Sequence, residues 1–207
     1  MEKIMITQSK QTLEEMTPEK ALELLKTGNQ RFLEKKQQKR NLLEQTSITS
    51  SGQYPFAVIL GCVDSRVPPE LVFDLGIGDV FSIRIAGNFV NEDILGSMEF
   101  ATKVVGSKHI VVLGHTSCGA IQGAKDQVEL GNLTGLVNKL QPAVEAVKNE
   151  IGPSEELDIN QIAEMNVTLT IEAIKQKSPI LRDMFEKKEI GISGAMYDVN
   201  TGKVDFL

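Results

Sequence analysis

Two short segments of the sequence carry residues that could bind a metal ion. Cys62 begins the segment Cys-Val-Asp-Ser-Arg, and His115 stands three residues before Cys118. Two thiolates and an imidazole are a typical zinc ligand set, and a catalytic zinc with three protein ligands keeps its fourth position for water. Zinc can lower the pKa of that water to about 7, which makes it a nucleophile toward an electrophilic carbon. These residues therefore predict a zinc centre that activates water.

A carboxylate and a guanidinium follow the first cysteine. Asp64 and Arg66 stand two positions apart, so their side chains project to the same side of an extended segment. An arginine can hold a carboxylate through two hydrogen bonds, which would keep Asp64 ionised and turn its second oxygen toward the metal-bound water. Asp64 could instead bind zinc as a fourth ligand and close the site. The spacing permits both arrangements.

Less reactive roles compete for the same residues. Either cysteine alone could be a buried small hydrophobic residue, and a disulfide between Cys62 and Cys118 would leave His115 without a role. The stronger alternative is a closed structural zinc site with Asp64 as the fourth ligand. The second histidine, His109, stands six residues before His115 on the same expected strand, roughly 20 Å away at ~3.3 Å per residue. We therefore expect a structural role for His109.

The two metal-binding segments follow apolar runs of strand length. Four such runs occupy residues 55–61, 79–87, 109–114 and 190–199. Their apolar residues are continuous rather than alternating, which is typical of strands covered on both faces in a parallel sheet. Ligands bind outside the carboxyl ends of such strands. Because Cys62 and His115 each follow a glycine at the end of a run, we expect the two segments to meet at that edge.

Helical segments separate the apolar runs. The sequence predicts helices that begin at Pro18 and Pro179, and others over residues 91–105, 119–149 with breaks, and 158–175. A hydroxyl residue followed by proline, as at both of these starts, is typical of helix N-termini. The alternation of strands and helices predicts a doubly wound α/β fold.

The whole chain, 1–207, is interpreted as one domain. Residues 1–45 would form an N-terminal helical arm and residues 46–207 the α/β zinc-binding core. Within the arm, residues 1–16 are expected to be a loosely held polar start. The basic run at 35–40 is expected to be a solvated helix end.

Composition narrows the class of protein. The chain has 22 basic and 28 acidic residues, a formal net charge of −6, which argues against nucleic acid or an anionic membrane as the main partner. No apolar run approaches the roughly 18–20 residues needed to span a bilayer, and the first 20 residues lack the apolar stretch of a signal peptide. We therefore expect a cytoplasmic protein, in which both cysteines are reduced rather than bridged.

Three segments resemble the signature segments of beta-class carbonic anhydrases, in the same order and at similar separations. They are GCVDSRVPPE (61–70), RIAGN (84–88) and GHTSCGA (114–120). The resemblance runs from about residue 17 to the C-terminus. It implies a mostly parallel central sheet of four strands plus an antiparallel edge strand, with helices on both faces. It also implies an N-terminal helical arm that embraces a partner subunit, in a homodimer or a higher homo-oligomer.

The resemblance further implies the activity and the residues that perform it. The reaction would be the reversible hydration of CO2 to bicarbonate and a proton by a zinc-bound hydroxide. Cys62, His115 and Cys118 would bind Zn2+. Asp64 and Arg66 would form the catalytic dyad, with Asp64 accepting a hydrogen bond from the hydroxide. The expected substrate-binding residues are Gln53, which would act across the subunit interface, the backbone of Gly119, and the apolar residues Phe81, Ala86 and Phe100.

One departure from the family pattern is informative. Some bacterial members build a regulatory bicarbonate site with a tryptophan three residues before the first cysteine, where this chain has Ile59. Arg84 and Tyr197 match other parts of that site, but the set is incomplete. We therefore predict the plant-like branch, with Asp64 held by Arg66 and an open zinc position. Arg84 is then expected to serve the structure near the RIAGN turn.

Two other functions fit the same ligand set. The first is hydrolysis of carbonyl sulfide or carbon disulfide, which are linear, uncharged carbon electrophiles like CO2. The second is a non-catalytic zinc-binding or redox-sensing protein, because two thiolates could release the metal when they are oxidised.

Overall fold

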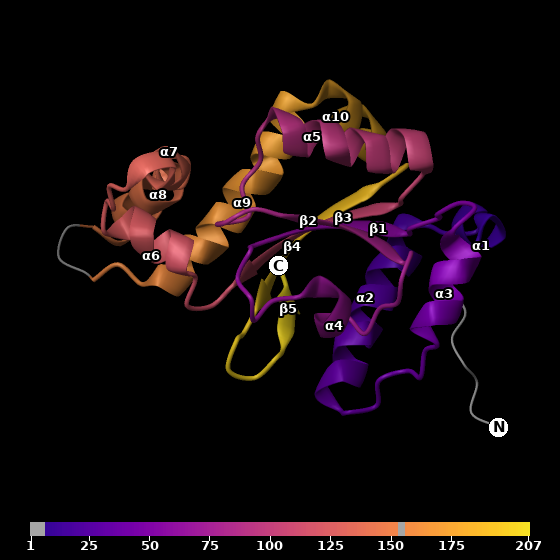
Figure 1. Cartoon of the computed structure of the whole chain (residues 1–207). Coiled ribbons are helices and arrows are strands. Elements are labelled where there is room, and N and C mark those ends of the chain that lie inside the picture. Colours follow the sequence, from indigo (N-terminus) through magenta and orange to yellow (C-terminus); the bar gives the residue numbers. More distant parts are fainter. Residues whose placement is uncertain (1–6, 153–155) are drawn as a thin grey trace.

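A five-stranded sheet forms the centre of the computed structural model, which describes residues 7–152 and 156–207 (Figure 1). Its strand order is β2-β1-β3-β4-β5. The first four strands are parallel, and β5 runs antiparallel to β4 at the edge. The strands are β1 (Ala57–Gly61), β2 (Val80–Arg84), β3 (His109–His115), β4 (Gly191–Tyr197) and β5 (Val204–Phe206). This sheet confirms the expected fold class, including the antiparallel edge strand.

Helices connect and cover the strands. In the described ranges they are α1 (Lys10–Glu14), α2 (Pro18–Leu33), α3 (Leu42–Thr49), α4 (Pro69–Val72), α5 (Glu92–Glu99), α6 (Gly119–Lys125), α7 (Gly131–Val137), α8 (Gln141–Ile151), α9 (Ile159–Lys177) and α10 (Pro179–Glu186). A π-helical segment, Phe100–Val105, continues α5. The Thr17 and Ser178 side chains accept the backbone N–H groups of Lys20 and Leu181, so both are N-caps as their sequence pattern predicts. Among these helices none is both long and apolar enough to cross a membrane.

Successive residues of β1 pack into two different apolar cores, because side chains alternate between the two faces of a sheet. Ala57 and Ile59 pack on one face with residues of α1, α2 and the α4 region. Val58 and Leu60 pack on the other face with residues of α5, α9 and α10. Figure 1 shows these two helical layers on opposite sides of the sheet. All five residues of β1 are buried, which explains why its sequence is apolar without interruption.

A third apolar cluster lies beyond the carboxyl ends of the parallel strands. It joins Cys62 and Cys118 to residues of α6, α7, α8 and the start of α9. In Figure 1 these helices form a lobe at the left of the sheet. The lobe therefore closes the edge at which the two predicted metal-binding segments lie.

One expectation for the N-terminal region is wrong where the structure describes it, and a second holds only in part; residues 1–6 of the expected loose start lie outside the described residues. Within residues 7–16, Ser9 caps α1 and Leu13 is buried in the core, so this stretch is packed rather than loosely held. The basic run is also not fully solvated. The Arg40 side chain is only 9% exposed, and its Nη1 lies 2.5 Å from Oδ1 of the buried Asp74. Arg31 contacts the other oxygen of Asp74 at 2.6 Å, and together the two arginines neutralise this buried carboxylate.

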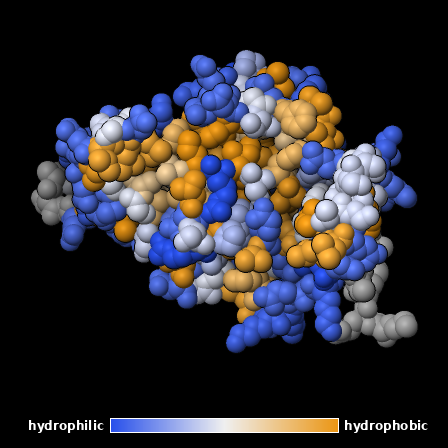
Figure 2. All heavy atoms as spheres, viewed as in Figure 1, coloured by the Kyte–Doolittle hydropathy of each residue, from blue (hydrophilic) through white to orange (hydrophobic). Residues whose placement is uncertain are grey.

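The outer edge of β2 carries half-buried apolar side chains, and exposed apolar residues lie beside it. Phe81 and Ile83 of β2 line a hollow together with Phe100, whose side chain is exposed. Val63 and Leu71, in the segment that follows β1, are also exposed. Figure 2 shows apolar side chains gathered across the middle of this face of the molecule, over and beside β2. Since an edge strand leaves backbone groups unpaired, this surface is suited to contact with another chain.

Candidate metal centre

The three predicted metal ligands converge at the carboxyl ends of β1 and β3. Cys62 directly follows β1, His115 is the last residue of β3, and Cys118 is the N-cap of α6. The strands are neighbours, with Gly61 beside Leu113, so residues 53 positions apart become adjacent. Their candidate ligand atoms all lie within 4.8 Å of one another, and the two sulfurs are 4.0 Å apart. All three side chains are at most 4% exposed.

The orientation of the histidine suits a metal ligand. Its Nδ1 lies 2.9 Å from the carbonyl oxygen of Thr116, which can only accept, so Nδ1 carries the proton and donates. In the neutral ring this tautomer leaves the lone pair on Nε2. It is buried and has no hydrogen-bond partner among the described residues. A buried ring nitrogen left without a partner, with two sulfurs beside it, fits a metal ion, and histidine ligands commonly donate their other N–H to a carbonyl in this way.

The sulfur pair shares a proton. A hydrogen bond from the Cys118 thiol lowers the pKa of Cys62 to about 4. The same bond, together with burial, raises the pKa of Cys118 above its ordinary value. The backbone N–H of Gly87 also donates to the Cys62 sulfur, at 3.4 Å. The contact thus favours a thiolate at Cys62, and thiolates are the form of cysteine that binds metal ions. The soft donors favour zinc over magnesium or calcium.

Asp64 and Arg66 form the pair that the sequence predicts. The Arg66 Nε and Nη2 atoms donate to the two carboxylate oxygens of Asp64 at 2.9 and 2.8 Å. These bonds lower the pKa of Asp64 to about 2, so it is ionised at neutral pH. Oδ2 of Asp64 lies 3.9 Å from Nε2 of His115. The carboxylate thus stands beside the ligand cluster while the guanidinium holds both of its oxygens.

Backbone contacts made by Arg84 hold the loop that carries this pair. The Arg84 Nε donates to the carbonyl of Cys62 at 2.9 Å, and its Nη2 donates to the carbonyl of Asp64 at 2.6 Å. This is the structural role expected for Arg84. The other residue considered for a regulatory site, Tyr197, is buried at the end of β4, where its carbonyl accepts the N–H of Thr116.

Two asparagines that the sequence analysis did not identify support the centre from α9. The Asn160 side chain accepts the N–H of Ser117 at 3.0 Å, and Asn166 donates to the carbonyl of Gly87 at 2.8 Å. Ser117 has a φ of 55°, an unusual conformation for a residue other than glycine. Its carbonyl accepts a bond from Arg66 at 3.2 Å. The asparagines lie more than 40 residues after the segments that they hold, so no local pattern reveals them.

The expected substrate-binding residues do not all share one pocket in the single chain. Phe81 and Phe100 contact each other, with ring centroids 6.1 Å apart, and both line the hollow beside β2. Neither Ala86 nor Gly119 is among the residues that line this hollow. Gly119 begins α6 directly after Cys118, and a Cβ built on it would meet no atom within 4 Å, so it borders open space. Gln53 is exposed near the opposite end of β1.

Comparisons with known proteins agree on one family. Residues 57–204 match the sequence model described as "Carbonic anhydrase". The chain is 33% identical over 192 residues to "Carbonic anhydrase 2" of Mycobacterium tuberculosis, with 90% of this chain and 91% of that protein covered. It is 32% identical over 195 residues to the carbonic anhydrase of Mycolicibacterium smegmatis, with 91% and 92% covered.

Solved structures give the same result. The beta-carbonic anhydrase CafA of Aspergillus fumigatus matches with a TM-score of 0.72 and 29% identity, over 80% of this chain and 81% of that one. One of two tetrameric beta-carbonic anhydrases from Sordaria macrospora matches with a TM-score of 0.68 and 27% identity, over 76% and 83% of the two chains.

Proposed function

Because the chain belongs to the beta-class carbonic anhydrase family, we propose that it catalyses the reversible hydration of CO2 to bicarbonate and a proton. The observation that carries the proposal is the buried Cys62, His115 and Cys118 cluster with an ionised carboxylate beside it. Zinc held by these three residues would supply a Lewis acid that makes a water molecule nucleophilic at neutral pH. The protein's other residues then have to orient that water and admit CO2.

Asp64 is the residue placed to orient the water. Since its pKa is about 2, it is unprotonated at neutral pH and can only accept a hydrogen bond. An acceptor beside the cluster would select the water's remaining proton and turn a lone pair toward the carbon of CO2. Arg66 keeps both Asp64 oxygens engaged at 2.8 and 2.9 Å, which opposes movement of the carboxylate onto the metal. This geometry supports the open site of the plant-like branch.

The open arrangement has a direct structural test. A crystal structure of the zinc-loaded protein near pH ~7.5 is expected to show Asp64 paired with Arg66. An Asp64 oxygen at ligand distance from zinc, about 2.0–2.2 Å, would overturn this part of the proposal.

The substrate site is proposed to lie between the metal centre and the β2 edge. Gly119 would present its backbone N–H next to the last ligand, while Phe81, Ala86 and Phe100 would provide apolar walls. Such walls suit CO2, which has no charge to bind and whose charged product must leave. Gln53 lies near the amino end of β1, so we infer that it serves the site of a partner subunit rather than that of its own chain.

We infer a homodimer or a higher homo-oligomer from the apolar hollow at the β2 edge, from the exposed apolar residues beside it and from the tetrameric Sordaria relative. The chain would act as one domain, with residues 1–45 as an arm and 46–207 as the core. Helix α3 spans that boundary, so the two parts are continuous. We place the protein in the cytoplasm, because two free, buried cysteines suit a reducing compartment.

The named relatives are carbonic anhydrases, and they do not favour our alternatives of carbonyl sulfide or carbon disulfide hydrolysis or of a non-catalytic zinc sensor. The deciding experiment measures zinc per chain and stopped-flow CO2 hydration on one preparation, with carbonyl sulfide in a parallel assay. About one zinc per chain and fast CO2 hydration are expected. Bound zinc without CO2 hydration would refute the proposed activity, and turnover of carbonyl sulfide alone would select the hydrolase.

A further inference from the structure

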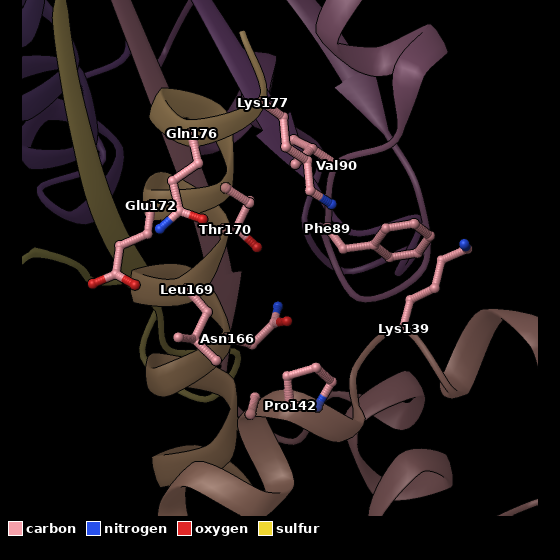
Figure 3. A pocket seen from close by; sticks show the side chains of 12 residues that line it. Phe89, Val90, Lys139, Pro142, Asn166, Leu169, Thr170, Glu172, Gln176 and Lys177 are labelled. Atoms are coloured by element: carbon pink, nitrogen blue, oxygen red, sulfur yellow. The ribbon is translucent and has the colours of Figure 1, made fainter. Parts of the chain in front are cut away.

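A second cavity lies away from the β2 edge, between α9, the start of α8 and the segment that follows β2. Its volume is about 360 Å3, within the range of small-molecule pockets. None of the predicted metal ligands lines it. Phe89 and Val90 form one wall, while Asn166 and Thr170 of α9 form another (Figure 3). The chemistry proposed for the metal centre gives this cavity no role.

Two buried polar side chains face the cavity. Asn166 and Thr170 are each only 4% exposed. The Thr170 hydroxyl forms no hydrogen bond with the described residues and is not one of their fully enclosed unpaired polar atoms, so it stays accessible from the cavity that it lines. The Asn166 amide nitrogen donates to the carbonyl of Gly87 at 2.8 Å and retains a second N–H. The floor of the cavity therefore offers hydrogen-bond donors that the protein itself does not use.

Two lysines give the rim a positive charge. Lys139 precedes α8 and Lys177 ends α9, and in Figure 3 their side chains extend toward opposite sides of the Phe89 ring. Neither amino group forms an ion pair within the part of the chain that the structure describes. The acidic residue at the rim, Glu172, points away from Phe89 in the same view. The side of the cavity nearest the aromatic wall thus combines cations with an apolar surface.

We propose that this cavity binds a small monocarboxylate whose apolar body packs against Phe89 and Val90. The carboxylate would accept hydrogen bonds from Thr170 and Asn166 and lie within the field of Lys139 and Lys177. A bare inorganic anion would leave the apolar wall unused, and a neutral apolar molecule would make no use of the two lysines or of the Thr170 hydroxyl. The assignment does not depend on the proposed catalytic function.

The test measures binding to the zinc-loaded protein by titration of backbone amide NMR shifts. The probe is phenylacetate, and 2-phenylethanol is its uncharged counterpart of nearly the same shape. We expect saturable shifts at the amides of Thr170 and its α9 neighbours, with phenylacetate binding at least about tenfold more tightly than the alcohol, since hydrogen bonds to a charged group are the stronger ones.

Substitutions then identify the residues that bind the carboxylate of the probe. Lys139→Gln and Lys177→Gln should each weaken phenylacetate binding about fivefold, as for an exposed ion pair. Thr170→Val, which keeps the side chain's shape, should weaken it about tenfold. Lys148→Gln is the matched control, because Lys148 is exposed on α8 but does not line the cavity, and it should bind normally.

Three outcomes would overturn the proposal. Shifts confined to the amides around Cys62 and His115 would place the probe at the metal. The other two are equal affinity for phenylacetate and 2-phenylethanol, and a phenylacetate affinity that none of the lysine and Thr170 substitutions changes. Loss of CO2 hydration in any of these samples would bear on the proposed function and leave the binding result intact.

Discussion

The side chain of Asn160 holds the backbone of Ser117 in a left-handed conformation, with 3.0 Å between Oδ1 and the peptide nitrogen and a φ of 55° at Ser117. That conformation turns the Ser117 carbonyl toward Arg66, which in turn binds Asp64. A residue at the start of α9 therefore positions the pair beside the metal cluster. A left-handed non-glycine residue costs roughly 1–2 kcal/mol, which the surrounding contacts must offset.

The first prediction concerns this contact. Asn160→Ala should lower the free energy of unfolding by about 1 kcal/mol and CO2 hydration several-fold, with zinc retained. Ser117→Gly removes the conformational strain, so Asn160→Ala should cost less in the Ser117→Gly background than in the wild type. A double-mutant cycle on unfolding and on kcat/KM measures the coupling. Asn138→Ala, at the exposed asparagine that directly follows α7, is the control. Strictly additive effects would contradict the linkage.

The second prediction separates the two histidines. His115→Gln and Cys62→Ser should each reduce zinc from about one ion per chain to near zero, because each removes one of three ligands. His109→Gln should keep its zinc, since His109 lies at the other end of β3. Elemental analysis after gel filtration gives the answer. Zinc lost only from the His109 variant would exclude the proposed cluster.

The third prediction concerns Asp64. Asp64→Asn keeps nearly the same shape but presents an amide that both donates and accepts, so it no longer selects one orientation of the water. Turnover should fall about 100-fold or more, while zinc stays bound. Stopped-flow CO2 hydration and zinc content are measured together, with Asp183→Asn on the surface of α10 as the control. An undiminished rate in Asp64→Asn would remove this carboxylate from the mechanism.

The fourth prediction is a pH dependence of stability centred on His109. Its Nδ1 donates to the carbonyl of Pro18 at 3.0 Å and its Nε2 contacts the Ser193 hydroxyl, so the neutral ring joins α2 to β4. Burial lowers the pKa of His109 below its ordinary value, because it outweighs the hydrogen bond to the Pro18 carbonyl and the charge of Glu19, which both raise that pKa. The unfolded chain therefore binds this proton more readily. The contribution is complete above about pH 6.5 and is lost as the pH falls below it.

Urea unfolding at pH 7.5 and 5.5, with saturating zinc, checks this sign. The wild type should lose more stability between the two values than His109→Gln does. Equal losses would show that His109 does not contribute to the acid sensitivity.

The features that could be predicted from the sequence rest on local signals. The Thr17 and Ser178 caps, the uninterrupted apolarity of β1 and the glycines before Cys62 and His115 each fix a short segment without information from elsewhere. Parallel pairing then brings the strand ends together, which is why two distant loops could be assigned to one metal centre.

The remaining features depend on contacts between distant parts of the chain. Helix α1 has only five residues and is stabilised by the burial of Leu13, and β5 has three residues that pair with β4 alone. Arg40 belongs to a basic run, and only the buried Asp74 reveals its structural role. The role of Gln53 could not be placed from the sequence in the same way. The site that it is proposed to serve lies on another copy of the chain, and one sequence does not show how two copies are arranged.

The position of β2 has a consequence for biosynthesis. This strand lies between Cys62 and His115 along the chain, yet it occupies the edge of the sheet, so the chain crosses from one side of β1 to the other before β3 can pair with it. A growing polypeptide therefore exposes its first thiol long before the imidazole and the second thiol emerge from the ribosome. Zinc can therefore bind to all three ligands only after roughly the first half of the protein has folded. Bound zinc would thus indicate that this part of the chain has reached its native structure.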